Sequence, residues 1–163
     1  VVGNNTFYDM TLTDNTFIGE YTYSLDSKGR VNIPAKFRKS LSADSQNTFV
    51  ITRGLDPCIW VYPLEQWKEI ENNLRNLSSV KNIHRTFVRD TARYASPSTY
   101  DKQGRITLTP SLTEYAVLEK DVLIIGMINK IEIWNPNTLK IVDQQNLEIE
   151  PDAYDDLADK IIL

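Results

Sequence analysis

The chain has 163 residues, of which 41% are hydrophobic and 25% are charged, as in an ordinary soluble globular protein. No apolar run approaches the roughly 20 residues of a membrane-spanning helix, which argues against a helical membrane protein. The net charge of −4, taken alone, argues against nucleic-acid binding. The single Cys58 lies beside Ile59 and Trp60 and is expected to be a buried thiol. These features together indicate a cytoplasmic protein.

The first half of the chain is expected to combine short strands with helices. Residues 1–16 are polar, have no period and are interpreted as a flexible leader. Alternating aromatic and β-branched residues predict strands, and apolar residues at a helical period predict helices. The expected strands are 17–25, 31–33, 49–52 and 58–62, and the expected helices are 35–41, 64–77 and 80–94.

From Ala95 onward the same order of elements starts again. A strand over 106–108, a short helix over 110–116 and strands over 122–125 and 130–134 follow the first half at an offset of about 73 to 75 residues. We therefore expect two similar halves that pack as a pseudo-dimer within one chain. The predicted divisions are a first repeat over 17–78, a connecting helix over 79–95, a second repeat over 96–142 and an acidic tail over 143–163.

One short motif occurs in both halves. It reads Asp26-Ser27-Lys28-Gly29-Arg30 in the first half and Asp101-Lys102-Gln103-Gly104-Arg105 in the second. Asp at the first position can accept bonds from the amides of a turn, and Gly at the fourth tolerates a positive φ. Each copy therefore predicts a tight turn with an Arg just after its Gly. A local salt bridge that steadies a turn is one interpretation, but the duplication favours a functional loop.

Charge is distributed unevenly along the chain. From Asp143 onward seven acidic residues stand against Lys160 alone, so residues 1–142 carry a net charge of +2. A basic patch lies between Asp26 and Lys39, where five basic residues accompany one acidic residue. A second group of basic residues recurs every four positions along the helix over 80–94, and it is interpreted as a solvated face or as subunit-contact salt bridges. Its members are Lys81, Arg85, Arg89 and Arg93.

Several of these segments, in this order, make the chain resemble the MraZ family from Phe17 to about Asp143. The segments are Phe17-Ile18-Gly19-Glu20-Tyr21, Leu25-Asp26-Ser27-Lys28-Gly29-Arg30, Ile33-Pro34-Ala35-Lys36-Phe37-Arg38, Thr52-Arg53-Gly54-Leu55-Asp56, Tyr62-Pro63 and Asp101-Lys102-Gln103-Gly104-Arg105. The resemblance implies an α+β fold, mainly β, in which two AbrB-like swapped-hairpin repeats form an intrachain pseudo-dimeric barrel with flanking helices. The segments before Phe17 and after Asp143 are expected to lie outside the family pattern.

The resemblance also implies a function. That family comprises bacterial transcriptional regulators associated with the nucleoid, which act on the promoter of the division and cell-wall gene cluster. Their subunits assemble as homo-oligomeric rings, and an Asp-x-x-x-Arg motif binds double-stranded DNA. The expected target is a set of direct repeats in the promoter. No cofactor, metal or small-molecule substrate is implied.

Carried over to this sequence, the motif assigns DNA binding to a small set of basic residues and loop shaping to the Asp and Gly residues. The expected DNA-binding residues are Arg30, Arg105, Lys28, Lys102, Lys36 and Arg38, and the expected loop-shaping residues are Asp26, Gly29, Asp101 and Gly104. Beyond the turn the second copy departs from the first, because Thr109 and Thr113 stand where the first has Pro34 and Arg38. The first repeat is therefore expected to make more phosphate contacts.

Two other classes of function were weighed. An enzyme is disfavoured, because His84 is the only histidine, Cys58 is expected to be buried, and no Gly-rich phosphate loop or metal-spaced cluster occurs. A protein–protein interaction module of the same fold, without DNA binding, remains the main alternative. The net negative charge mildly favours that alternative.

Overall fold

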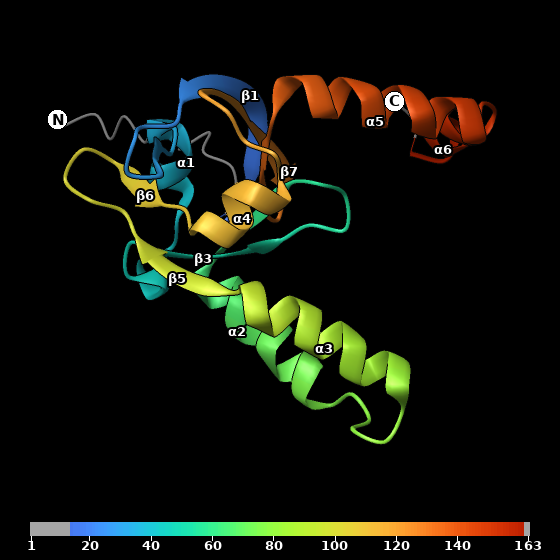
Figure 1. Cartoon of the computed structure of the whole chain (residues 1–163), viewed down its shortest axis with the longest axis horizontal. Helices are drawn as coiled ribbons and strands as arrows, with labels where there is room; N and C mark the ends of the chain where they lie inside the picture. The colour runs from blue at the N-terminus through green and yellow to red at the C-terminus, as the bar shows by residue number, and fades with distance from the viewer. Residues whose placement is uncertain (1–13, 162–163) are drawn as a thin grey trace, which may run out of the picture.

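The computed structural model describes residues 14–161, and within them strands and helices alternate as an α+β fold (Figure 1). The first half contains β1 (Phe17–Ser24), β2 (Arg30–Asn32), α1 (Ala35–Ser40), the 3-10 helix η1 (Ala43–Ser45), β3 (Thr48–Arg53), β4 (Ile59–Pro63), α2 (Leu64–Arg75) and α3 (Asn82–Tyr94). The second half contains β5 (Ser96–Thr99), β6 (Arg105–Thr107), α4 (Pro110–Tyr115), β7 (Asp121–Ile128), β8 (Ile131–Trp134), α5 (Pro136–Ile149) and α6 (Ala153–Ile161). The predicted repetition of elements is confirmed.

The strands of the two halves interleave. The main sheet has the order β1-β7-β8-β4-β3-β5, so β1 of the first half pairs with β7 of the second, and β5 of the second half pairs with β3 of the first. The two halves meet at the β4–β8 pair in the middle. Each half has thus given its first strand to the other, which is the swapped arrangement expected of a pseudo-dimer within one chain.

The predicted barrel is corrected in one respect: the main sheet is open. Strands β1 and β5 are its two edges, and each pairs on one side only. After β1 the chain turns back, and β2 pairs with β6 in a separate two-stranded sheet instead of extending the main one. Periodicity in the sequence indicates where helices and strands lie, but it does not determine whether a sheet closes into a barrel.

The core lies between the main sheet and the layer formed by β2, β6, α1 and α4. Corresponding residues of the two halves fill it. In each half these are the middle residue of β2 or β6, the residue just after that strand and one residue of the short helix α1 or α4, and all are at most 2% exposed. These are Val31, Ile33 and Phe37 in the first half and Ile106, Leu108 and Leu112 in the second. Burying each such side chain contributes about 1.5–3 kcal/mol, so this pseudo-symmetric core holds β2 and β6 in place.

A buried carboxylate joins the two halves at their central strands. Glu132 of β8 accepts hydrogen bonds from the indole Nε1 of Trp60 at 2.8 Å and from Trp134 at 3.0 Å. Cys58 is fully buried, as predicted, and its Sγ lies 3.6 Å from the same carboxylate. Burial, with the negative charge of Glu132 as a second cause, raises the pKa of the Cys58 thiol far above its ordinary value. The cysteine is therefore an inert core residue.

Two helical segments project from the sheet in different directions (Figure 1). Helices α2 and α3 form one arm and α5 and α6 form the other, and none of the four helices contains a fully buried residue. The predicted start of the acidic tail, residue 143, falls inside α5. None of the helices within residues 14–161 is long and apolar enough to cross a membrane.

The expected flexible leader lies mostly outside the described residues, but its last residues are held. The Asn15 backbone N–H donates to the Ser40 carbonyl at 2.7 Å, and its side chain donates to Glu65 at 3.0 Å. Ser42 also donates to Glu65, at 2.6 Å, and these hydrogen bonds lower the pKa of the Glu65 carboxyl. Asn15 therefore ties the start of β1 to the beginning of α2, which the sequence analysis did not anticipate.

Candidate nucleic-acid interface

The first Gly-Arg turn, residues 26–30, is organised by its aspartate. The Asp26 Oδ1 accepts hydrogen bonds from the backbone N–H groups of Lys28 at 2.9 Å and Arg30 at 2.8 Å. Its Oδ2 accepts from the Arg30 Nε at 2.7 Å. Gly29 has a φ of 74°, a left-handed conformation that favours glycine, and donates to the Asp26 carbonyl at 3.0 Å. The aspartate therefore fixes both the backbone of the turn and the direction of the arginine.

The second Gly-Arg turn, residues 101–105, repeats this geometry. The Asp101 Oδ1 accepts from the backbone N–H groups of Gln103 and Arg105, both at 2.9 Å, and its Oδ2 accepts from the Arg105 Nε at 2.9 Å. Gly104 has a φ of 77° and donates to the Asp101 carbonyl at 2.9 Å. The two turns thus share the same hydrogen bonds at the same relative positions, although 75 residues separate them.

Pairing of β2 with β6 brings the two turns side by side. The strands are antiparallel, with Arg30 opposite Thr107 and Asn32 opposite Arg105. Each glycine carbonyl is bonded by the other half: Gly29 accepts from the Leu108 N–H at 2.8 Å, and Gly104 accepts from the Ile33 N–H at 2.9 Å. The Arg105 Nη1 also lies 3.9 Å from the Asp26 Oδ2. Each turn is therefore stabilised by hydrogen bonds from the other half of the chain.

The β2–β6 pair, called the ribbon below, presents one polar face. Val31 and Ile106 are fully buried on its inner face, so the alternation of a strand places their neighbours on the outer one. The outer residues are Arg30, Asn32, Arg105 and Thr107. Asn32 and Thr107 were not among the predicted site residues, although the polar-apolar-polar pattern of each strand already placed them beside the predicted arginines.

The ribbon has suitable chemistry for recognising paired acceptors. A guanidinium bound through its Nε retains a second edge, formed by its two Nη atoms, which can bind two further acceptors at once. The side chains of Arg30 and Arg105 are 30% and 24% exposed. A two-stranded ribbon is also one of the shapes that the major groove of B-DNA admits, and bidentate arginine–guanine pairing is the commonest base-specific contact there.

Both aspartates have a pKa below the ordinary value for the side chain. The largest cause in each turn is the hydrogen bond from the backbone N–H of the arginine, Arg30 for Asp26 and Arg105 for Asp101. The arginine side chain adds a hydrogen bond and a favourable charge in both turns. Each aspartate is therefore ionised at neutral pH and holds a negative charge beside the arginine that it orients.

Arg38, one of the predicted DNA-binding residues, also contacts the second half of the chain. Its Nε donates to the Ile33 carbonyl at 3.1 Å, and its guanidinium lies over the ring of Tyr100 at 5.8 Å from the centroid. A Cβ atom added at Gly104 would lie only 2.5 Å from the Arg38 Cζ. Arg38 of the first half thus packs directly on the turn of the second half, so it has a structural contact beside any contact with DNA.

The predicted lysines are exposed around the ribbon. Lys28 and Lys102 lie within the two turns, and Lys36 lies on α1 with Lys39 three residues further on. The corresponding positions on α4 are Ser111 and Glu114, so this part of the surface is basic in the first half only. These lysines can contact phosphates, which position a protein on DNA without reading its sequence.

The residues considered for other chemistry do not assemble into a site. Within residues 14–161 no group of His, Cys, Asp and Glu side chains is arranged to hold a metal ion. The Nδ1 of His84 accepts a hydrogen bond from the Ser78 backbone N–H at 3.0 Å, which orders the turn between α2 and α3. The basic residues of α3 lie on the α2–α3 arm, and Arg85 there donates to the carbonyls of Ser79 and Val80.

The fold and the site define a class of protein: an internally duplicated chain whose halves exchange strands and whose two Asp-Gly-Arg turns meet on one ribbon. A family model described as "MraZ protein, putative antitoxin-like" matches residues 16–90 and again residues 92–157. The chain belongs to the MraZ family. The second match continues past residue 143, so α5 and part of α6 belong to the family pattern, which corrects the shorter extent expected from the sequence.

Curated relatives agree with this assignment. The protein named transcriptional regulator MraZ of Natranaerobius thermophilus is 45% identical over 146 residues, which cover 90% of this chain and 96% of the relative. The protein of the same name from Halothermothrix orenii is 48% identical over 119 residues, covering 73% and 80% of the two chains. That of Pediococcus pentosaceus is 42% identical over 146 residues, covering 90% and 96%.

Proposed function

We propose that this chain is a sequence-specific DNA-binding transcriptional regulator, and that the ribbon is its DNA-reading element. The curated relatives are named transcriptional regulators. The single observation that supports the proposal most strongly is the pairing of two arginine-presenting turns from distant parts of the chain on one exposed, antiparallel ribbon. A turn stabilised for its own sake has no need of a second copy beside it.

In this proposal the ribbon enters the major groove. Arg30 and Arg105 contact the O6 and N7 atoms of guanines, while Asp26 and Asp101 hold the arginines in place and do not themselves touch the DNA. The exposed lysines Lys28, Lys102 and Lys36 contact phosphates, and Arg38 supports the second turn. The negative net charge is compatible with this role because residues 143–163 carry seven acidic residues against one lysine, which leaves residues 1–142 with a net charge of +2.

One subunit offers two Gly-Arg turns and a few lysines, which is too little for tight binding at physiological salt. We infer that several copies assemble into a ring and bind together, so that their contacts add in one event. A head-to-tail ring presents its ribbons in the same sense at every step, so the target consists of direct repeats and not a palindrome. The expected target is the promoter of the division and cell-wall gene cluster, which places the protein in the cytoplasm on the nucleoid.

A gel shift on promoter DNA with direct repeats tests this function. Repeats spaced by about one helical turn of ~10–10.5 bp should bind best, because successive ribbons then meet the same face of the DNA. Inserting ~5 bp between repeats rotates one of them to the opposite face and should weaken binding strongly. Equal affinity for both spacings would contradict cooperative recognition, and equal affinity for unrelated DNA of the same length would contradict sequence specificity.

The alternative is a protein–protein interaction module that does not bind DNA. Two observations favour it: the printed family description includes the words "putative antitoxin-like", and the chain is net negative. Retention on heparin with steeply salt-dependent elution separates the two functions, because phosphate contacts release counterions and an apolar protein interface does not. A protein that flows through heparin at low salt would favour the alternative.

A further inference from the structure

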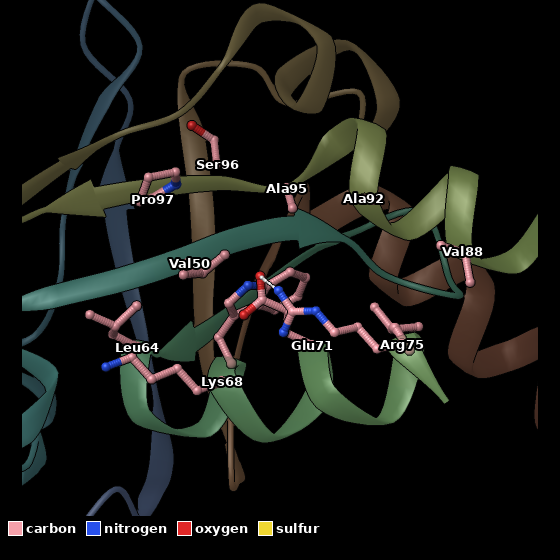
Figure 2. Close-up of a pocket in the computed structure, with 12 residues that line it drawn as sticks. Val50, Leu64, Lys68, Glu71, Arg75, Val88, Ala92, Ala95, Ser96 and Pro97 are labelled. Atoms are coloured by element: carbon pink, nitrogen blue, oxygen red, sulfur yellow. Dashed lines mark ion pairs between the residues drawn. The ribbon is translucent and has the colours of Figure 1, made fainter. Parts of the chain in front are cut away.

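The arm formed by α2 and α3 carries a long, uncovered groove, called the α2–α3 groove below. Two hollows of about 570 Å³ and 360 Å³ share the lining residues Leu74 and Val88 and therefore adjoin each other on the arm. Figure 2 shows the larger one, which lies between α2, α3 and the β3–β5 edge of the sheet. Its lining is mainly apolar and includes Leu64, Trp67 and Ala92. This lining can receive apolar side chains of a partner.

Positive charge surrounds this apolar lining. Lys68 and Arg75 border the larger hollow, and Arg85 and Arg89 border the smaller one. One acidic residue, Glu71, also lines the larger hollow and is paired with Arg75 at 3.4 Å. Two members of the basic stripe, Arg85 and Arg89, therefore lie beside an apolar groove and not on a plain solvated face.

The second arm of the molecule has the complementary character. Residues 136–161, which form α5 and α6, contain seven acidic and two basic residues. Large apolar side chains remain exposed between these acids, and this surface is called the α5–α6 ridge below. They are Ile141, Leu147, Ile149, Tyr154, Leu157 and Ile161. Helices without buried residues gain little stability from their own chain, so this ridge also lacks a partner within one molecule.

Within one chain the two surfaces do not meet, because the arms leave the sheet in different directions (Figure 1). We propose that the α5–α6 ridge of one copy docks in the α2–α3 groove of a second copy, with its acids facing the arginines and lysines of the groove. α5 has 14 residues and spans about 21 Å, comparable with the 12-residue α2 that it would lie along. The contact joins two different surfaces, so a docked pair keeps one free groove, on the copy that contributed its ridge, and one free ridge, on the other copy.

The proposal rests on the assembly under the proposed function and names the surfaces that produce it. A second copy fits the groove better than DNA does, because the larger hollow is lined mainly with apolar side chains, which can pack against the exposed apolar side chains of the ridge but not against phosphates. Repetition of a contact between different surfaces gives a ring when the rotation closes. All ribbons of such a ring point in the same sense, as direct repeats require.

Two variants block the two surfaces separately. Ala92→Glu places a carboxylate in the groove, and Leu157→Asp places one on the ridge. Both positions are exposed in the single chain, so the fold should be kept, which circular dichroism checks. The matched control is Ile128→Asp at the β7–β8 turn, because Ile128 is 61% exposed and Leu157 is 59% exposed. By size-exclusion chromatography with light scattering, we expect wild type and control to assemble and each blocked variant to be monomeric.

Mixing the two blocked variants gives the decisive result. The intact ridge of Ala92→Glu should dock in the intact groove of Leu157→Asp, so an equimolar mixture should form dimers, twice the monomer mass, and nothing larger. A mixture that stays monomeric, a mixture that forms larger assemblies, a blocked variant that assembles like wild type, or a monomeric wild type would each overturn the proposal. Heparin retention of the monomeric variants reports on DNA binding separately, because both keep the ribbon.

Discussion

The two Gly-Arg turns are nearly identical, whereas the short helices that follow them are not. Each turn has the same aspartate hydrogen bonds, the same left-handed glycine and the same arginine contact. In contrast, α1 carries Lys36, Arg38 and Lys39, and α4 carries Ser111, Thr113 and Glu114 at the corresponding positions. The helix ends differ too, since the Thr109 side chain caps α4 while α1 begins after Pro34 without a side-chain cap.

This difference shows which features of a duplicated half depend on the other half. The turns bind each other through the carbonyls of Gly29 and Gly104 and through β2–β6 pairing, so a change in one disturbs both. The outer faces of α1 and α4 have no such reciprocal contact and can differ in charge. The two turns of the ribbon are thus related by a pseudo-two-fold symmetry, whereas the charges on the helices beside them are not. Variants of the turn arginines and aspartates should therefore have similar effects in both halves, and variants of α1 and α4 should not.

The largest effect is expected from the two arginines. Arg30→Ala and Arg105→Ala should each weaken binding to promoter repeats by about 1–3 kcal/mol per subunit, roughly 5- to 150-fold, without changing the melting temperature markedly. The reason is that both arginines lie on the outer face of the ribbon and outside the core. Gel shifts at one salt concentration measure this. If Arg105→Ala binds the DNA as tightly as wild type does, the second turn shares the geometry of the first but does not contact the DNA.

The two glycines should differ in their effect on stability. Ala at either position is forced into the left-handed region, at about 1–2 kcal/mol. Gly104→Ala should cost about 1 kcal/mol more than Gly29→Ala, because its Cβ displaces the Arg38 guanidinium from its hydrogen bond and from Tyr100. Urea denaturation measures both. The excess should disappear in an Arg38→Ala background, and an excess that persists there would show that Arg38 is not its cause.

The sequence predicted local features well because their causes are local. An Asp-x-x-Gly-Arg motif determines its own turn, since the aspartate bonds amides two and four residues further on. Alternation and helical period likewise located most strands and the helices α1 to α4, although not β5, α5 or α6, and the duplication implied a pseudo-dimer. The resemblance to the MraZ family further predicted that the two halves exchange strands. Pairing of β1 with β7 and of β5 with β3 confirms that prediction.

Features that depend on distant pairs were missed. Arg38 packs on a turn 66 residues away, and nothing in its local sequence indicates that contact; its predicted role in DNA binding stays a prediction. The anchoring of Asn15 by Glu65 spans 50 residues and was likewise not foreseen. The open sheet differs from the expected barrel because closure depends on whether the two edge strands meet. Asn32, in contrast, does not depend on a distant pair. Its position in the alternation of β2 already placed it on the same face as Arg30, so it could have been predicted.

A smaller effect is expected from the lysines of α1. The double variant Lys36→Ala with Lys39→Ala should lower the slope of log affinity against log salt by up to ~1.8, because each phosphate contact contributes about 0.9. The matched control in the second half is Ser111→Ala with Glu114→Ala, which removes no positive charge and should not lower the slope. Equal slopes for wild type and the lysine variant would show that α1 makes no phosphate contacts.

The smallest effect concerns the aspartates and pH. The backbone and side chain of the neighbouring arginine lower the pKa of Asp26 and of Asp101 in the folded state, while the unfolded carboxyls keep a pKa near 3.9. Because the folded pKa is the lower one, the ionised turns stabilise the protein above about pH 4, and this stabilisation is lost as the pH falls through the folded pKa values.

Between pH 5 and pH 2 the melting temperature should therefore fall less steeply in Asp26→Asn and in Asp101→Asn than in wild type. The same bonds form in both turns, so both variants should flatten the curve by similar amounts. A larger effect in Asp26→Asn would instead show that the contact between Asp26 and Arg105, at 3.9 Å, makes the pair of turns unequal.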